Sequence, residues 1–314
     1  MTGYVLRRVG QAAVVLLGVS VIVFGLMQLV PGDPVRVALG TRFDQETYDA
    51  LRERAGLDRP LLVQYFAYLG NALTGDLGVS FRSGQPVTQT LLERLPATLS
   101  LAAGALLIAL LIAIPLGLVS AVRSGKVSDY FATVFSQIGV SVPDFWMAIL
   151  LILLFTTTLG WLPPSGYVPF TESPLGWLEH IAMPALTVGV VSGSILTRFV
   201  RSSVLESMSQ DYVRTANSKG LPGRTVLRRH VVRGALVPVV TVTGVQLATL
   251  LGGVVVVEVI FAWPGLGRLT YDAVQARDYP VLQGAVLIFA TIFLLVNLLV
   301  DLLYAALDPR IENR

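Results

Sequence analysis

The stretch from Ala97 to Val122 reads ATLSLAAGALLIALLIAIPLGLVSAV and contains no Asp, Glu, Lys or Arg. About 20 apolar residues in an α-helix cross the hydrocarbon core of a bilayer, so this stretch is long enough to span a membrane by itself. The same four residue types are absent from five further stretches: Val9–Val30, Phe145–Thr171, Ile181–Thr197, Gly234–Val257 and Tyr279–Val300.

The composition agrees with a chain that lies largely in lipid. Only 14% of the 314 residues are charged, whereas soluble domains carry about a quarter, and the mean hydropathy is +0.71. The six stretches therefore predict an all-α integral membrane protein with six transmembrane helices. The third helix is expected to begin near Tyr130, which places Pro143 and Asp144 inside it. A signal peptide is the alternative for the first stretch, but its apolar run is longer than such a peptide needs.

The distribution of Lys and Arg predicts that both termini are cytoplasmic. With the N-terminus inside, the cytoplasmic segments hold 14 of the 23 basic residues, eight of them between Arg198 and Arg233. Seven of the nine external ones lie in the long segment Pro31–Pro96, where the positive-inside rule weakens. Basic cytoplasmic loops also account for the net charge of +3 without a nucleic-acid partner.

The external segment predicts short amphipathic helices. Asp44 is placed to cap a first helix that Gly56 ends. After Pro60, six apolar residues recur on one helical face: Leu61, Leu62, Tyr65, Phe66, Leu69 and Leu73. Such a segment can lie on the membrane surface, cover the helical core and meet an external partner, or serve as a structural lid alone.

The internal loop Arg198–Arg233 has eight cations and only two acids. We expect a short helix with Asp211 as its N-cap, a low-profile face at Thr215 and Ala216, and an end at Gly220, where glycine permits a positive φ. A second helix is expected through Val226 to Arg233. A cytoplasmic protein can bind such a projecting helix; attraction of a basic loop to anionic headgroups is the alternative.

The residues needed for common catalytic sites are missing from the sequence. It has no cysteine and two histidines, His180 and His230, so no thiolate site can form and we expect no metal site. It also contains no GxxxxGK[ST], HExxH or GxSxG motif. We therefore expect a protein that is not an enzyme, has no catalytic residues and cannot be an ATPase.

The sequence Asp211-Tyr212-Val213-Arg214-Thr215-Ala216, followed by Lys219-Gly220, is similar to the "EAA" loop of inner-membrane permease subunits of ABC importers. The similarity is to the form found in the dipeptide, oligopeptide, glutathione and nickel group. Arg214 and Thr215 stand where the general motif has Glu and its first Ala, and Arg233 stands where proline is common. Five other motifs carry the resemblance: Pro31-Gly32-Asp33-Pro34, Gly56-Leu57-Asp58-Arg59-Pro60-Leu61, Gly75-Asp76-Leu77-Gly78, Trp263-Pro264-Gly265-Leu266-Gly267 and Arg277-Asp278-Tyr279-Pro280.

The resemblance implies a type I ABC importer permease fold in a bacterial or archaeal inner membrane. Its expected parts are residues 1–94 (first helix and external segment), 95–305 (five-helix core with the loop 198–233) and 306–314 (cytoplasmic tail). The implied partners are a second homologous permease, two cytoplasmic ATPases that bind ATP and Mg, an external substrate-binding protein and the lipid bilayer. The chain itself is expected to need no cofactor.

The implied function is to form half of a translocation pathway for di- and oligopeptides. Nickel, glutathione and oligosaccharides are the alternative substrates within the same machinery. A secondary transporter is the alternative of a different class, which often shows inverted repeats and paired intramembrane charges. We see no obvious repeat here, and the clearest intramembrane acid is the single Asp144.

Three groups of site residues follow. The residues expected to couple the chain to an ATPase are Arg214, Thr215, Ala216, Lys219 and Gly220. The expected pathway or gate residues are Asp144, Gln246, Thr249 and Glu258. The residues expected to contact the external binding protein are Trp263, Pro264 and Leu266. Asp144 can instead be tied to a neighbouring helix, and an interfacial anchor is the alternative for Trp263. Gly189 and Gly193 form a GxxxG pattern that allows close helix packing.

Overall fold

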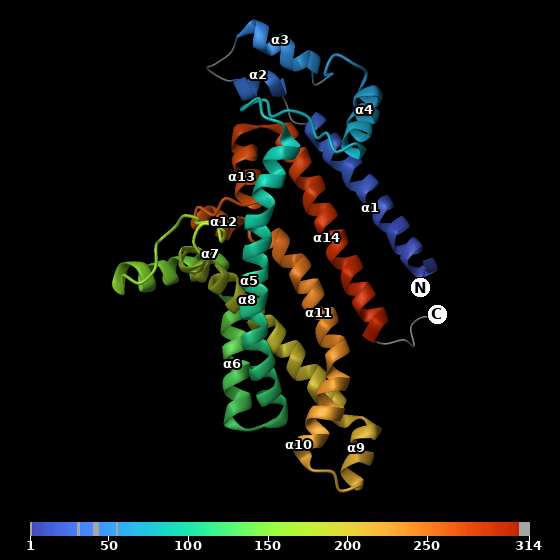
Figure 1. The fold of residues 1–314 in the computed structure, drawn as a ribbon, viewed down its shortest axis with the longest axis vertical. Coiled ribbons are helices and arrows are strands. Elements are labelled where there is room, and N and C mark those ends of the chain that lie inside the picture. Colours follow the sequence, from blue (N-terminus) through green and yellow to red (C-terminus); the bar gives the residue numbers. More distant parts are fainter. Residues whose placement is uncertain (1, 30–31, 40–43, 55, 308–314) are drawn as a thin grey trace. The chain divides into compact units, whose positions relative to one another are not determined.

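The computed structural model describes residues 2–29, 32–39, 44–54 and 56–307, and its regular elements there are helices (Figure 1). Pro31 of the predicted motif and residues 308–314 of the predicted tail lie outside the described residues. The chain divides into two compact units. Unit 1 comprises Met1–Thr98 with Pro264–Leu295, and unit 2 comprises Leu99–Trp263 with Val296–Arg314.

Five of the predicted spans are confirmed as long apolar helices, several of them longer than the charge-free stretches indicate. They are Val5–Leu29 within α1 (Thr2–Leu29), α5 (Val87–Val122), α8 (Pro174–Ser209), Gly223–Gly252, and Tyr279–Leu302 within α14 (Tyr279–Leu307). The fourth span differs most: the prediction has 17 residues and α8 has 36. Its additional turns carry Arg198 and Arg201, because polar residues at a membrane boundary do not end a helix.

The third predicted span is wrong in its bounds. The structure has α6 (Val127–Ser141), α7 (Asp144–Leu151) and the π-helix η2 (Ile152–Thr158), with a bend of 102° between the α6 and α7–η2 segments. Pro143 lacks the N–H that an uninterrupted helix needs, and Val142 before it is extended (φ −86°, ψ 121°). Residues 159–173 contain no helix. Pro143 therefore breaks the predicted span, and Asp144 begins a new helix.

Unit 2 is built around α8, in which 67% of the most apolar window is buried, compared with 11% for α1. Helices α6 and α11 (Val232–Gly253) pack against it. The predicted close packing at Gly189 and Gly193 is confirmed: a Cβ at Gly189 would lie 2.7 Å from Ile108 and 2.9 Å from the Ala105 carbonyl of α5. Gly139 of α6 packs as closely against Ser194. Small residues therefore determine how near the helices of this unit approach one another.

Unit 1 holds the external segment together with α13 (Leu266–Ala276) and the adjoining parts of α5 and α14. Its core consists of Val87, Leu91, Leu266, Ala273, Val281 and Ala285. Helices α2 (Pro34–Leu39), α3 (Gln45–Arg54) and α4 (Leu61–Leu73) confirm the expected short helices. The side chain of Asp44 accepts a hydrogen bond from the Thr47 N–H at 3.0 Å, and Gly56 has φ +64°, so the predicted cap and end of α3 are also confirmed.

Helix α4 contacts α1 through aromatic side chains. The Tyr65 ring lies edge-on to Phe24 at 5.5 Å, and its hydroxyl is 3.0 Å from Ser20 Oγ. No residue of α4 is buried, and Leu62, Phe66 and Leu73 are mostly exposed. The predicted apolar face is therefore present, and apart from the Tyr65 contact with α1 much of it is exposed in the described chain.

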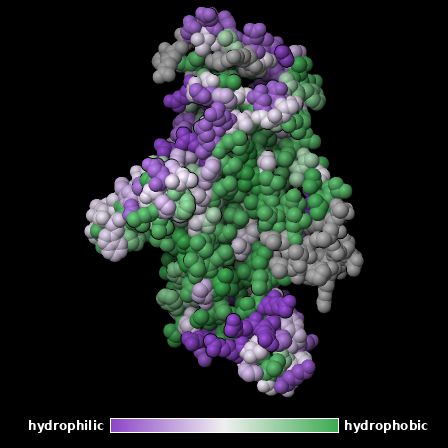
Figure 2. All heavy atoms as spheres, viewed as in Figure 1, coloured by the Kyte–Doolittle hydropathy of each residue, from purple (hydrophilic) through white to green (hydrophobic). Residues whose placement is uncertain are grey.

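In each unit, hydrophobic and hydrophilic side chains gather over different helices at the surface (Figure 2). Within unit 2, hydrophobic side chains cover the long helices, whereas hydrophilic ones gather over α9 (Asp211–Ser218) and α10 (Gly223–Val226). Within unit 1, hydrophilic side chains gather over α3. Lipid contact is expected along the former surfaces and water along the latter.

Substitution of Gly189 by alanine tests the close packing of α5 and α8. We expect Gly189→Ala to destabilise the protein by about 1–3 kcal/mol, because the new methyl group overlaps Ile108 and a backbone carbonyl that cannot rotate away. Thermal unfolding of the detergent-solubilised protein measures the effect. Gly18→Ala is the matched control, since nothing lies within 4 Å of a Cβ there. Equal unfolding temperatures for the two variants would contradict this packing.

Candidate functional site

The segment that joins α8 to the next long helix is shorter than the predicted loop of residues 198–233. Helix α8 continues to Ser209, and a continuous helical stretch starts again at Gly223 with α10, the π-helix η3 (Leu227–Val231) and α11. We call residues 210–222, which contain α9, the coupling segment. A short connection between two long helices restricts how far α9 can move independently of them.

Helix α9 has one buried face and one exposed face. Val213 and Ala216, three residues apart, are 4% and 5% exposed and pack with Val204 of α8 and Val231 of η3 in one core. Arg214, Thr215 and Lys219 are exposed. Of the two residues of the predicted low-profile face, Thr215 is exposed and Ala216 is buried, because successive helical residues point about 100° apart.

The sequence predicts the C-terminal end of α9 correctly but not its N-cap. Gly220 has φ +73°, and its N–H donates to the Asn217 carbonyl at 2.9 Å, so the predicted left-handed end is confirmed. Asp211 is the first residue of α9 and not its N-cap, a position that Gln210 occupies. Both partners of the Asp211–Arg214 ion pair are well exposed and 3.5 Å apart, so this pair contributes little stability.

Three residues of this region form a polar contact that sequence analysis did not single out. The hydroxyl groups of Tyr212 and Ser207 are 2.9 Å apart, and Ser207 Oγ donates to the Val231 carbonyl at 2.9 Å. A Cβ at Gly234 would overlap the Tyr212 hydroxyl. The only signal in the sequence is the tyrosine of the Asp-Tyr-Val motif, because nothing local indicates that Val231 and Gly234, 19 and 22 positions later, lie at the same place.

A second polar contact that the sequence analysis missed lies at the ends of α5, α6 and α8. Arg201 Nε and Nη2 donate to the two carboxylate oxygens of Asp129 at 2.8 and 3.0 Å. Asp129 also accepts from the Ser120 hydroxyl and, at 2.9 Å, from the Gly125 N–H. The carboxylate is only 10% exposed, and these donors satisfy both of its oxygens. They fasten the α5–α6 turn to α8.

The predicted pathway residues are spread over several elements of unit 2. Asp144 is half-buried at the start of α7, and its Oδ1 atom is buried without a hydrogen-bond partner among the described residues. Gln246 of α11 donates to Ser192 of α8 at 3.2 Å, and Thr249 is exposed on α11. Among the described residues, then, no hydrogen bond ties Asp144 Oδ1 to a neighbouring helix. Whether these three residues line a pathway stays a prediction.

Glu258 is placed differently from its prediction. It lies on the separate short helix α12 (Val255–Ile260) and not on the fifth span, and it is fully buried. Its side chain therefore does not meet water in this arrangement, and its role in a gate stays a prediction. Its position follows from the end of α11 at Gly253, after which the chain begins α12 against α7 and α8.

Two of the three residues predicted for external contact are also buried. Trp263 is 0% exposed and lies edge-on to Tyr167 at 4.7 Å in unit 2. Leu266 is 0% exposed in the core of unit 1, and Pro264 is half-buried. The expectation of Trp263 as an interfacial anchor is wrong, because an anchor needs an exposed ring. The side chains of Trp263 and Leu266 are not available to an external partner in this arrangement.

Two protein families match the chain over most of its length. Residues 113–313 match the family described as the inner membrane component of binding-protein-dependent transport systems, and residues 1–102 match the N-terminal region of such membrane components. The chain belongs to this family. It is therefore a membrane permease component and not itself an enzyme.

Relatives of this permease match over nearly their whole length. A Brucella abortus protein provisionally named a peptide transport system permease is 47% identical, over 99% of each chain. The oligopeptide transport system permease protein AppB of Bacillus subtilis is 40% identical, over 99% of this chain and 100% of its own. The dipeptide transport system permease protein DppB of Escherichia coli (strain K12) is 39% identical, over 100% of each.

The solved structures that resemble the permease are those of ABC transporters. The inward-facing methionine ABC transporter MetNI has a TM-score of 0.57 at 18% identity, over 70% of this chain and 97% of its own. An amino acid ABC transporter has a TM-score of 0.52 at 18% identity, over 71% and 94%. At this identity the likeness concerns the fold alone.

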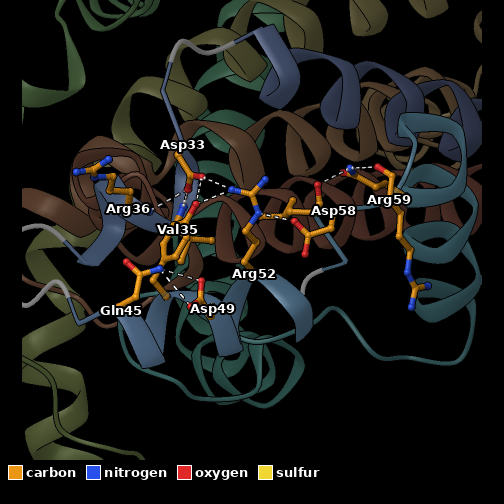
Figure 3. Close-up of polar contacts among 11 residues, drawn as sticks. Asp33, Val35, Arg36, Gln45, Asp49, Arg52, Asp58 and Arg59 are labelled. Atoms are coloured by element: carbon orange, nitrogen blue, oxygen red, sulfur yellow. Dashed lines mark hydrogen bonds and ion pairs between the residues drawn. The ribbon is translucent and has the colours of Figure 1, made fainter.

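The external segment of the permease contains a third polar cluster (Figure 3). Asp33 Oδ1 accepts from the N–H groups of Val35 and Arg36 at 3.0 Å each and so caps α2. Its Oδ2 accepts from the Tyr48 hydroxyl at 2.7 Å and from Arg52 at 3.1 Å. Arg52 also pairs with Asp58 beyond the end of α3. One carboxylate therefore connects α2 to α3.

These contacts lower the pKa of Asp33. Burial raises the pKa of this carboxyl, but hydrogen bonds from Tyr48 and from the backbone of Arg36 and Val35, together with the charge of Arg52, outweigh it. A pKa that is lower in the folded than in the unfolded segment means that ionised Asp33 stabilises the fold at neutral pH. That contribution is lost as the pH falls through the lowered pKa.

Acidification tests the cluster. We expect the protection factors of the α2 and α3 amides, which are exchange rates corrected for the intrinsic effect of pH, to fall as the pH drops below about 4 toward the lowered pKa of Asp33. Asp33→Asn keeps a capping oxygen but no charge, so it should weaken protection at neutral pH and flatten this pH dependence. Asp49→Asn, which changes an exposed carboxylate on α3, is the control. If Asp33→Asn lost protection at low pH to the same extent as the unaltered protein, Asp33 would not be the group that holds α2 to α3.

Proposed function

We propose that the permease forms half of the translocation pathway for di- and oligopeptides in an ATP-driven importer. The observation that carries the proposal is the coupling segment: a helix with a buried face that anchors it between α8 and η3 and an exposed face with Arg214, Thr215 and Lys219. The peptide substrate is supported by the relatives named as dipeptide and oligopeptide permeases, which match over their full lengths.

The proposed partners are a second homologous permease, two cytoplasmic ATPases and an external binding protein. ATP and Mg²⁺ bind to the ATPases, and the exposed face of α9 contacts one of them. This assignment puts both termini and the coupling segment in the cytoplasm, which the excess of Lys and Arg in those segments supports. The clustering of cations on the coupling segment and the start of the next helix agrees with it.

The mechanism follows from how α9 is attached. Closure of the ATPases on ATP moves α9, and its buried face transmits this movement to α8 and to the helical stretch that begins at Gly223. Packed helices move as rigid bodies between discrete arrangements and do not deform continuously. The pathway then opens alternately, with Asp144, Gln246 and Thr249 as the proposed lining residues. In this scheme α8, the most buried span, transmits the movement across the membrane.

Reconstitution of the complete complex in proteoliposomes tests this function. We expect uptake of a labelled dipeptide only when ATP is inside with the ATPases and the loaded binding protein is outside. Unlabelled oligopeptides should compete, whereas nickel, glutathione and oligosaccharides should not; competition by one of these alone would replace the proposed substrate. Uptake driven by an ion gradient through this chain alone would contradict the ABC mechanism and indicate a secondary transporter.

Gly220 provides a sharper test of coupling. A β-branched residue at φ +73° is strained by about 1–2 kcal/mol, so Gly220→Val should displace the end of α9 while the spans stay inserted. We expect ATP hydrolysis to continue and dipeptide uptake to fall. Gly223→Ala, where a Cβ has open space, is the control. Normal uptake by Gly220→Val would remove the role assigned to this glycine.

A further inference from the structure

The hydroxyl groups of Tyr212 and Ser207 form a hydrogen-bonded chain with a defined direction. A serine hydroxyl has one proton to donate, and Ser207 donates it to the Val231 carbonyl at 2.9 Å. The 2.9 Å contact between the two hydroxyls therefore requires Tyr212 to donate to Ser207. One chain of two hydrogen bonds thus runs from α9, through the end of α8, to the last residue of η3.

The backbone of α11 leaves room for this chain only because residue 234 is glycine. A Cβ at that position would overlap the Tyr212 hydroxyl and would lie 2.7 Å from Ser207 Oγ. Both atoms lie at the ends of side chains, so a methyl group there displaces the hydroxyls and leaves the helix backbone in place. Gly234 therefore controls whether Tyr212 can reach Ser207.

The hydroxyl chain and the apolar core attach α9 in two different ways. Val213 and Ala216 pack into a core shared by α8, η3 and α11, and apolar contacts of this kind are non-directional, so they do not by themselves select one register. The hydroxyl chain is directional and has fixed donors and acceptors, so it determines one register of α9 against α8 and η3. Helix α9 is therefore positioned as well as attached.

We propose that Tyr212, Ser207 and Gly234 are positioning residues for energy coupling in this permease. They hold α9 in one register, so that a displacement of α9 moves α8 and α11 together and is not lost as local sliding of α9. The inference rests on the proposed function. It adds three residues to Arg214, Thr215 and Lys219, which the proposed function assigns to contact with the ATPase.

Two substitutions remove the hydroxyl chain by different routes. Tyr212→Phe deletes its donor and keeps the ring, and Gly234→Ala displaces the same hydroxyl by a methyl group. Matched controls are Tyr271→Phe, whose side chain is also 45% exposed, and Gly252→Ala, at which a Cβ has nothing within 4 Å. The complete reconstituted complex is used for all variants, and ATP hydrolysis and dipeptide uptake are measured together.

We expect the number of dipeptides imported per ATP to fall about threefold to tenfold in Tyr212→Phe and in Gly234→Ala, the range that one hydrogen bond corresponds to. Complex assembly, unfolding temperature and ATP hydrolysis should stay near those of the unaltered protein. Because both changes break one contact, the double variant should be no worse than the poorer single variant. A residue that acts only on stability would lower assembly and leave the coupling ratio unchanged.

A spectroscopic measurement tests the register of α9 without transport. The chain has no cysteine, so Ser218→Cys on α9 and Leu236→Cys on α11 provide unique sites for spin labels. We expect one narrow distance distribution in the otherwise unaltered protein. It should broaden in Tyr212→Phe and Gly234→Ala but not in Tyr271→Phe or Gly252→Ala.

Several results would overturn the inference: an unchanged coupling ratio in both variants, independent falls that multiply in the double variant, or an equal fall in the controls. Failure of the unaltered complex to import any peptide with ATP would instead count against the proposed function. In that case the spin-label distances alone decide the inference. A narrow distribution that persists in both variants would overturn it.

Discussion

Close packing of α8 against its neighbours is the interaction on which the rest of unit 2 depends. In a bilayer, lipid is as apolar as the helix surfaces, so helices associate through packing and hydrogen bonds and not by escape from water. Gly189 and Gly193 of α8 and Gly139 of α6 bring the backbones near enough for this. The coupling segment follows directly from the end of α8, so the position of α9 depends on how firmly α8 itself is held.

Two polar contacts in this unit lie toward helix ends. The Asp129–Arg201 pair fastens the α5–α6 turn to α8, and the Tyr212–Ser207–Val231 chain fastens α9 to α8 and η3. Both contacts involve the same helix, at Arg201 and Ser207, nine and three residues before the coupling segment begins. Packing thus determines the distance between the helices, and directional hydrogen bonds determine the position of their ends relative to one another. Rigid-body movement needs both, because an end that slides does not transmit displacement.

In the external part of unit 1, polar contacts connect elements that are too short to be stable by themselves. Its external helices are short, and helices of this length are marginal in water without further contacts. Asp33, Tyr48 and Arg52 connect α2 to α3, while Asp278 accepts hydrogen bonds from the Ser80 hydroxyl and, at 3.2 Å, from the Phe81 N–H. Motifs such as Gly75-Asp76-Leu77-Gly78 and Arg277-Asp278-Tyr279-Pro280 therefore lie in segments that hold this unit together. Their presence in the sequence indicates the fold more directly than it indicates a binding surface.

The sequence by itself determined the features that depend on local chemistry. Runs without charge indicate spans because the backbone in lipid must bond internally. The cap at Asp44 and the positive φ at Gly220 follow from side-chain reach and from the missing Cβ. Only the tertiary structure decided which residues are covered. Ala216, Glu258 and Trp263 are buried because elements distant in sequence pack over them, and the partners of Tyr212 are found only where α8, α9 and η3 meet. Burial depends on which elements pack together after folding. The same local sequence pattern is compatible with several tertiary arrangements, so it does not determine which residues are buried.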